Sequence, residues 1–250
     1  MSGAGLLPPG WMTGALSRAK DWLVEPVEAR EQAVGEPAPA LPEPLFREPA
    51  HPVVAVIALA PRCGASTLAR WLGAELAGRD PEGAAIVLSP RPSGAGPLRS
   101  GSVASLDRAL AARRIGPVRA AGRLCLLDAA AHSPLTVAAT CLAPLVIDGG
   151  HGASAGGLTS LADFVVLVAV PSVEPSLAAV MAASLARTGP EPFVVVNRAD
   201  EAERWEDRPG LLLPSSRLGA RRAAAGRAPG GALGVAVARI ADACEESVWV

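Results

Sequence analysis

The chain has 250 residues and a net charge of −1, so its overall charge supplies no basic field of the kind that attracts nucleic acid. Half of its residues are apolar, which is enough for one sizeable core, and this length suits one α/β domain with a short appendage. No apolar run reaches the length of a membrane span. The N-terminus lacks a basic segment ahead of a continuous apolar stretch, which argues against a secretory signal.

The cysteine and lysine content narrows the chemistry further. The cysteines are widely spaced, with no CxxC pair and no histidine at ligand spacing, so we expect reduced thiols in a cytoplasmic protein rather than zinc ligands or disulfides. The four are Cys63, Cys125, Cys141 and Cys244. Lys20 is the only lysine, and every other basic residue is an arginine. A mechanism that needs a lysine in the folded core therefore has no residue to use.

The N-terminal part differs in composition from the rest. In residues 1–34, apolar residues that include Trp11 and Trp22 recur at helical spacing, which predicts an amphipathic helix. Residues 35–52 hold six prolines and are expected to form an extended linker. A tethered helix with two tryptophans could dock a protein partner, or it could fold back onto its own domain.

Residues 53–250 alternate apolar strand-like runs with helical patterns. This predicts an α/β fold, doubly wound, with a mainly parallel sheet of about seven strands and helices on both faces. In the helix expected at 176–188, Leu177, Val180, Met181 and Leu185 are predicted to face inward. The predicted strands are 53–60, 85–89, 124–128, 145–148, 164–170, 193–196 and 211–213, and the other predicted helices are 66–77, 105–114, 135–142 and 232–243.

The turn after the first strand is the expected anion site, because ligands bind beyond the carboxyl ends of parallel strands. A phosphate-binding loop requires glycines, a lysine and a Ser or Thr in the pattern GxxxxGK[ST]. Residues 59–67 read LAPRCGAST, so only Gly64, Ser66 and Thr67 fit. The turn alone is equally consistent with a plain helix start.

Two later strands end in polar residues at the same edge of the predicted sheet. Asp148 ends the strand LVID and is followed by two glycines, and a carboxylate there can hold a magnesium-bound water. Asn197 ends the strand VVVN, where it could read a base edge or instead satisfy loop amides. Asn197, Arg198 and Asp200 are similar to the guanine-reading NKxD pattern, which leaves GTP open beside ATP.

In order and spacing, these segments resemble the MinD/ParA branch of P-loop ATPases, the SIMIBI-class proteins with a deviant Walker A motif. The resemblance covers residues 52–243 and implies the P-loop NTPase fold, with ATP or GTP and Mg²⁺ as ligands. It implies Ser66 and Asp148 as magnesium residues. The residues that it places at the nucleotide are Arg62, Cys63, Gly64, Ala65, Ser66, Thr67 and Asn197.

The departures from the family pattern lie at its charged positions. The signature lysine of the deviant loop falls on Ala60, the Walker A lysine on Ala65, and the strand-two aspartate near Ser89. Loss of one preorganised donor costs about 3 kcal/mol of transition-state stabilisation, roughly a hundredfold in rate. We therefore expect no catalytic residue and a degenerate, weak or non-hydrolysing nucleotide-binding adaptor that positions a cellular partner.

Two alternatives remain open: an active ATPase in which Arg62 replaces the lysine, and a nucleotide-free scaffold that acts through the N-terminal tryptophans. The resemblance also allows a homodimer.

Cys63 beside a helix start could be a reactive thiol or a small loop-filling residue. A basic cluster could bind DNA nonspecifically or form a solvated helix face, and the balanced net charge favours the second interpretation. The cluster consists of Arg217, Arg221, Arg222 and Arg227.

Overall fold

The computed structural model describes residues 51–90, 92, 101–151, 155–201, 205 and 210–247. The predicted N-terminal helix of residues 1–34, with Trp11 and Trp22, lies outside the described residues, as does nearly all of the linker. Within the described part, no helix is both long enough and apolar enough to cross a membrane.

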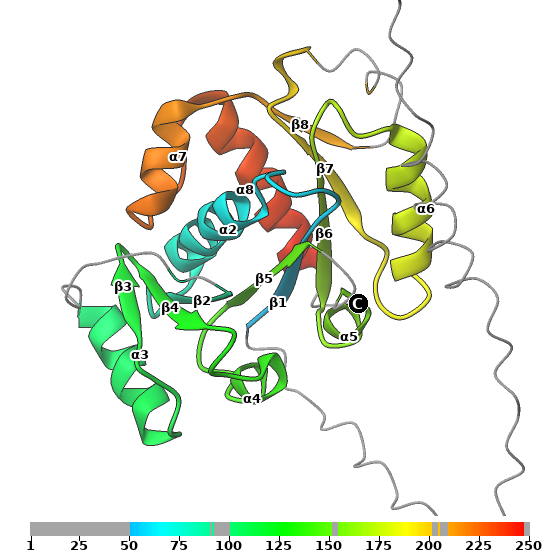
Figure 1. The fold of residues 1–250 in the computed structure, drawn as a ribbon. Coiled ribbons are helices and arrows are strands. Elements are labelled where there is room, and N and C mark those ends of the chain that lie inside the picture. The colour runs from blue at the N-terminus through cyan, green and yellow to red at the C-terminus, as the bar shows by residue number, and fades with distance from the viewer. Residues whose placement is uncertain are drawn as a thin grey trace, which may run out of the picture. The chain divides into compact units, whose positions relative to one another are not determined.

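A single eight-stranded sheet, in the order β3-β4-β2-β5-β1-β6-β7-β8, organises the described residues (Figure 1). All neighbouring strands are parallel except β3, which is antiparallel to β4. The α/β prediction with a mainly parallel sheet is therefore confirmed. The strands are β1 (Val53–Ala58), β2 (Ala85–Ser89), β3 (Arg119–Ala121), β4 (Leu124–Asp128), β5 (Leu145–His151), β6 (Phe164–Ala169), β7 (Phe193–Asn197) and β8 (Leu211–Leu213).

Helices cover both faces of the sheet (Figure 1). Helices α2, α7 and α8 share one apolar core with one face of the sheet, and α3 and α4 pack against the opposite face with β2, β4 and β5. Helices α5 and α6 cover β1 and β6 on that second face. The helices are α2 (Ala65–Arg79), α3 (Gly101–Ala112), α4 (Pro134–Ala138), α5 (Ala155–Thr159), α6 (Pro175–Leu185), α7 (Arg217–Ala224) and α8 (Gly231–Ser247).

Strand β1 lies in the middle of the sheet because its whole sequence is apolar. It pairs with β5 on one side and β6 on the other, and no residue of Val53–Ala58 is more than 9% exposed. Alternate side chains enter the cores on opposite faces, as the alternation of Cβ directions in a strand requires. This double burial fixes the position of the turn that follows β1.

The predicted elements did not include strand β3, helix α5 or helix α7. Strand β3 has only three residues and no β-branched one, and it joins β4 through a two-residue turn that begins with Gly122 at φ 57°. The residues of α7 were expected to form a solvated helix face or a DNA-binding patch, with no packing role. Helix α7 packs against α2, where the Trp71 Nε1–H donates to the Gly219 carbonyl at 2.9 Å.

Helix α6 corrects one detail of the predicted core. Leu185 is 5% exposed and Met181 packs on the β1–β6 side, as predicted. Leu177 and Val180 are 49% and 66% exposed, so the prediction that they face inward is wrong. Helix α6 buries a narrower stripe than its uniformly apolar sequence indicated, because periodicity cannot define a face when nearly every position is apolar.

A buried residue and an exposed residue of α6, Leu185 and Val180, give a matched test of this packing. Leu185→Ala should lower the free energy of unfolding by about 2–5 kcal/mol, because it opens a cavity in the core. Val180→Ala on the same helix should change it by less than about 0.5 kcal/mol. Denaturant titrations of both variants measure this difference, and equal losses would contradict the placement of α6.

Candidate functional site

The turn predicted to bind phosphate lies between β1 and α2, at the carboxyl end of the central strand. Gly64 precedes the helix and has a left-handed φ of 91°. Its carbonyl accepts hydrogen bonds from the N–H groups of Thr67 (3.0 Å) and Leu68 (2.9 Å), which start the helix. The loop therefore has the strand–turn–helix context that the sequence pattern requires.

The first backbone N–H groups of this helix are free to bind a ligand. Those of Gly64, Ala65 and Ser66 donate no hydrogen bond to any part of the chain that the structure describes. They precede a 15-residue helix, whose dipole favours negative charge at this end. Successive free N–H groups at such a position form an anion-binding concavity.

The side chains of the loop divide into buried and exposed groups. Cys63 and Ala65 are buried, Thr67 is half-buried, and Arg62 and Ser66 are exposed. Arg62, with a left-handed φ of 64°, is the one cation that the loop itself presents to solvent. Burial raises the pKa of the Cys63 thiol, while backbone hydrogen bonds and the charge of Arg198 oppose that rise. This direction disfavours a reactive thiolate and supports the interpretation of Cys63 as a loop-filling residue.

Asn197, from the end of β7, holds the loop from above. Its side-chain Nδ2 donates to the Cys63 carbonyl at 2.9 Å, and its Oδ1 accepts from the Arg198 N–H at 3.0 Å. A Cβ atom added to Gly64 would overlap the same Nδ2. The side chain is 6% exposed, so in this geometry Asn197 acts as a brace of the loop, which was the second interpretation of its position.

Asp148 lies at the same edge of the sheet, on the neighbouring strand β5. The pairing of β5 with β1 shifts register between Val56 and Ile57, which leaves Gly149 as an extra residue directly after Asp148. Strand β5 therefore continues through a bulge to His151, where the sequence had indicated a turn. The Asp148 carboxylate accepts from the Ser89 hydroxyl at 2.9 Å and from the Gly150 N–H at 3.2 Å.

Arg70 is a residue of this site that the sequence did not indicate. It lies on α2 and is only 8% exposed, and Asp148 acts on it electrostatically. Burial lowers the pKa of Arg70, and the negative charge of Asp148 acts in the opposite direction. Its position four residues after Ser66 places a buried cation one helical turn below the loop. The sequence feature that could have indicated Arg70 is an arginine at a position of the predicted helix that is otherwise surrounded by apolar residues.

The donor set is compatible with a magnesium ion bound together with phosphate. Ser66 offers an exposed hydroxyl, and each oxygen of Asp148 accepts one hydrogen bond, which leaves further lone pairs. Magnesium keeps most of its water and needs few protein ligands. No cluster of three or more His, Cys, Asp or Glu side chains occurs among the described residues, so a site made by protein groups alone is not present there.

The residues that resembled a guanine-reading pattern make contacts within and between the loops that follow β7 and β8. Asp200 accepts hydrogen bonds from the Ser215 N–H at 3.1 Å on both carboxylate oxygens, and contacts with Ser215 lower its pKa. Arg198 is exposed, has a left-handed φ of 60° and lies within electrostatic reach of Cys63. This segment therefore adds a second arginine beside the loop.

No protein-family model matches the sequence, and no curated protein matches it significantly. Among solved structures, a ParA family ATPase from Chlorobium tepidum TLS superposes with a TM-score of 0.52 at 16% identity, covering 77% of this chain and 98% of that one. The chain has a ParA-like P-loop fold. The MinD cell division protein of Aquifex aeolicus superposes with a TM-score of 0.48, also at 16% identity, covering 77% of this chain and 96% of that chain.

Thiol labelling tests the buried state of the loop. At pH 8, iodoacetamide should modify the half-buried Cys141 first, because Cys63, Cys125 and Cys244 are fully buried. Burial also raises their thiol pKa values, that of Cys125 to about 12, so each holds less thiolate at a given pH than an exposed cysteine does. Mass spectrometry of a labelling time course measures the order. Labelling of Cys63 at the rate of Cys141 would show that the loop opens readily.

Proposed function

We propose that this protein is a nucleotide-binding adaptor on a ParA-like fold that binds ATP and hydrolyses it slowly or not at all. The observation that carries the proposal is the free N–H groups of Gly64, Ala65 and Ser66 at the start of α2. These groups can cradle phosphate oxygens without any lysine. The cytoplasm, which keeps thiols reduced, is the location that we infer from the four free cysteines.

Hydrolysis is expected to be poor because the groups that would stabilise developing charge are absent. By the resemblance, the two family lysines fall on Ala60 and Ala65, and the strand-two aspartate falls near Ser89. Bound magnesium would neutralise phosphate charge, and Ser66 with Asp148 would hold it. Ser89 is a neutral hydroxyl that donates to Asp148, so the site has no second carboxylate at this position to orient an attacking water.

The adaptor role is the part of the proposal that involves partners. The N-terminal segment with Trp11 and Trp22 is proposed to dock a protein partner that the P-loop domain positions, and pairing of two copies is compatible with the proposal. Deletion of residues 1–34 should abolish partner capture in a pull-down and leave nucleotide affinity unchanged. Equal capture by the shortened chain would remove this segment from the proposal.

Titration with fluorescent ATP and GTP, with Mg²⁺ and with EDTA, tests the binding. We expect saturation at roughly micromolar ATP, and at least tenfold weaker binding for Gly64→Ala, because a Cβ there overlaps Asn197. Gly101→Ala is the matched control, since nothing lies within 4 Å of the added Cβ. In Ser66→Ala, ATP should bind equally tightly with Mg²⁺ and with EDTA, because the hydroxyl that would hold the ion is absent. Absence of binding by the unaltered chain would support the nucleotide-free scaffold and overturn the proposal.

Restoring the missing lysine tests whether the loop geometry is intact. Ala65→Lys should tighten ATP binding by roughly tenfold, because a charged donor returns to the phosphates. Ala65→Met, of similar length without charge, controls for the added volume. An equal affinity for both variants would mean that the loop does not place residue 65 at the phosphate.

Steady-state phosphate release separates the adaptor from the active ATPase. We expect the unaltered chain and Arg62→Ala to release phosphate at the same background rate, because Arg62 contacts no reacting group in the proposal. A rate well above background that collapses in Arg62→Ala would establish the competing activity, in which Arg62 replaces lysine.

A further inference from the structure

A second candidate site lies at the opposite end of α2, away from the phosphate loop. A hollow of about 350 Å³ opens between the second half of α2, the β3–β4 turn and the segment that follows α7. Its volume lies within the range of small-molecule sites. We call it the arginine hollow. The residues that line it are Ala74, Glu75, Gly78, Gly122, Arg123, Arg222, Gly226, Arg227 and Ala228.

Backbone contacts between two glycines fix the rim of this hollow. Gly122 and Gly226 both have left-handed φ angles, 57° and 62°. A Cβ atom on Gly226 would overlap the Ala121 carbonyl, and one on Gly122 would lie 2.5 Å from the Gly226 carbonyl oxygen. The β3–β4 turn and the end of α7 therefore touch main chain to main chain. The next residue after each glycine is an arginine, so this contact places Arg123 and Arg227 on one hollow.

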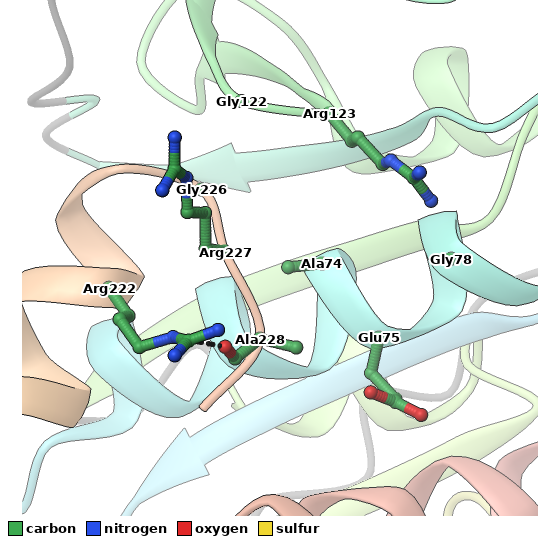
Figure 2. Close-up of a pocket in the computed structure, with 9 residues that line it drawn as sticks. All are labelled: Ala74, Glu75, Gly78, Gly122, Arg123, Arg222, Gly226, Arg227 and Ala228. Atoms are coloured by element: carbon green, nitrogen blue, oxygen red, sulfur yellow. Dashed lines mark hydrogen bonds between the residues drawn. The ribbon is translucent and has the colours of Figure 1, made fainter. Parts of the chain in front are cut away.

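The arginine hollow carries an excess of positive charge. Figure 2 shows the side chains of Arg123, Arg222 and Arg227 at three separate points of the hollow, with their guanidinium groups apart from one another. Arg222 is held in place, since its Nε donates to the Ala228 carbonyl at 2.8 Å. The side chains of Arg123 and Arg227 have no hydrogen-bond or ion-pair partner in the part of the chain described.

The acidic residue of the hollow does not neutralise these arginines. The Glu75 Oε1 accepts from Arg79 at 3.2 Å, and the Arg79 guanidinium also pairs with Asp242 at 2.7 Å and Glu245 at 3.0 Å. Glu75 is therefore already engaged on the α8 side. Arg123, Arg222 and Arg227 are all exposed, so their charges remain available to an anion that enters the hollow.

We propose that the arginine hollow binds a small multivalent oxyanion, a phosphate or a phosphomonoester, independently of the nucleotide site. Guanidinium groups match phosphate oxygens with paired N–H donors, and two of the three here are free to turn toward a ligand. The walls of Ala74, Gly78 and Ala228 have room for a compact organic group attached to the phosphate.

The surroundings favour a small anion over a nucleic acid duplex. Asp242 and Glu245 lie on α8, on the other side of Arg79 from the hollow, and both side chains are substantially exposed. A long polyanion that crossed the hollow in that direction would meet these carboxylates. The balanced net charge of the chain supplies no wider basic field to offset them.

Calorimetric titration of the full chain with pyrophosphate tests the proposal, in the Gly64→Ala background so that the phosphate loop does not contribute. Gly78 is exposed, and the Arg123 Nη1 lies 3.7 Å from the position of an added Cβ. Gly78→Glu should pair with Arg123 and weaken pyrophosphate binding at least tenfold. Gly78→Gln should retain it and controls for side-chain volume, and thermal melting checks that both variants fold.

Each outcome of this titration either supports or overturns anion binding in the arginine hollow. Pyrophosphate binding that is weakened in Gly78→Glu and preserved in Gly78→Gln supports the proposal. Titration with a phosphomonoester then shows whether the hollow prefers a free or an esterified phosphate. Equal binding by both variants, or no binding by the Gly64→Ala parent at millimolar pyrophosphate, overturns it. Tighter binding of duplex DNA than of pyrophosphate, lost in Gly78→Glu, would assign the arginines to nucleic acid. These results are independent of the ATP titration, so either site can fail without the other.

Discussion

The candidate nucleotide site depends on the unpaired backbone N–H groups of Gly64, Ala65 and Ser66 at the start of α2. Their position follows from the burial of β1 on both faces, which fixes the end of the central strand. Backbone donors are independent of side-chain identity, so this part of a phosphate site can persist when charged residues are replaced. The proposed function therefore separates binding from catalysis, and it expects substitutions at the charged positions to affect catalysis more.

The charges of Asp148 and Arg70 balance each other next to the candidate site. The Asp148 carboxylate remains at the end of β5, where Ser89 and the Gly150 N–H hold it and the buried Arg70 lies within electrostatic reach. A buried carboxylate without partners would be costly, so these contacts are required whether or not a ligand binds. Arg70 lies in the body of α2 and is 8% exposed, so its charge compensates Asp148 from inside the helix layer.

The sequence predicted the sheet because its strands are continuous apolar runs separated by turn signals. It failed where local pattern is weak: β3 is three residues long, and α7 is stabilised by the contact of Trp71 with Gly219 from another helix. The loop and Asp148 could be located from spacing. The hydrogen bond of Asn197 to the loop could not, because it joins residues 134 positions apart. The two Gly–Arg pairs of the arginine hollow are likewise close only in the folded chain.

The most direct test of the account is the response of individual loop amides to ATP. In ¹H–¹⁵N spectra of the labelled chain, ATP should shift the resonances of Gly64, Ala65 and Ser66 more than those of helices on the other face, such as α3. Shifts of this kind without release of phosphate over the same period are the predicted result. If the amide resonances at the start of α2 do not shift under saturating ATP, the claim that this loop binds phosphate is contradicted.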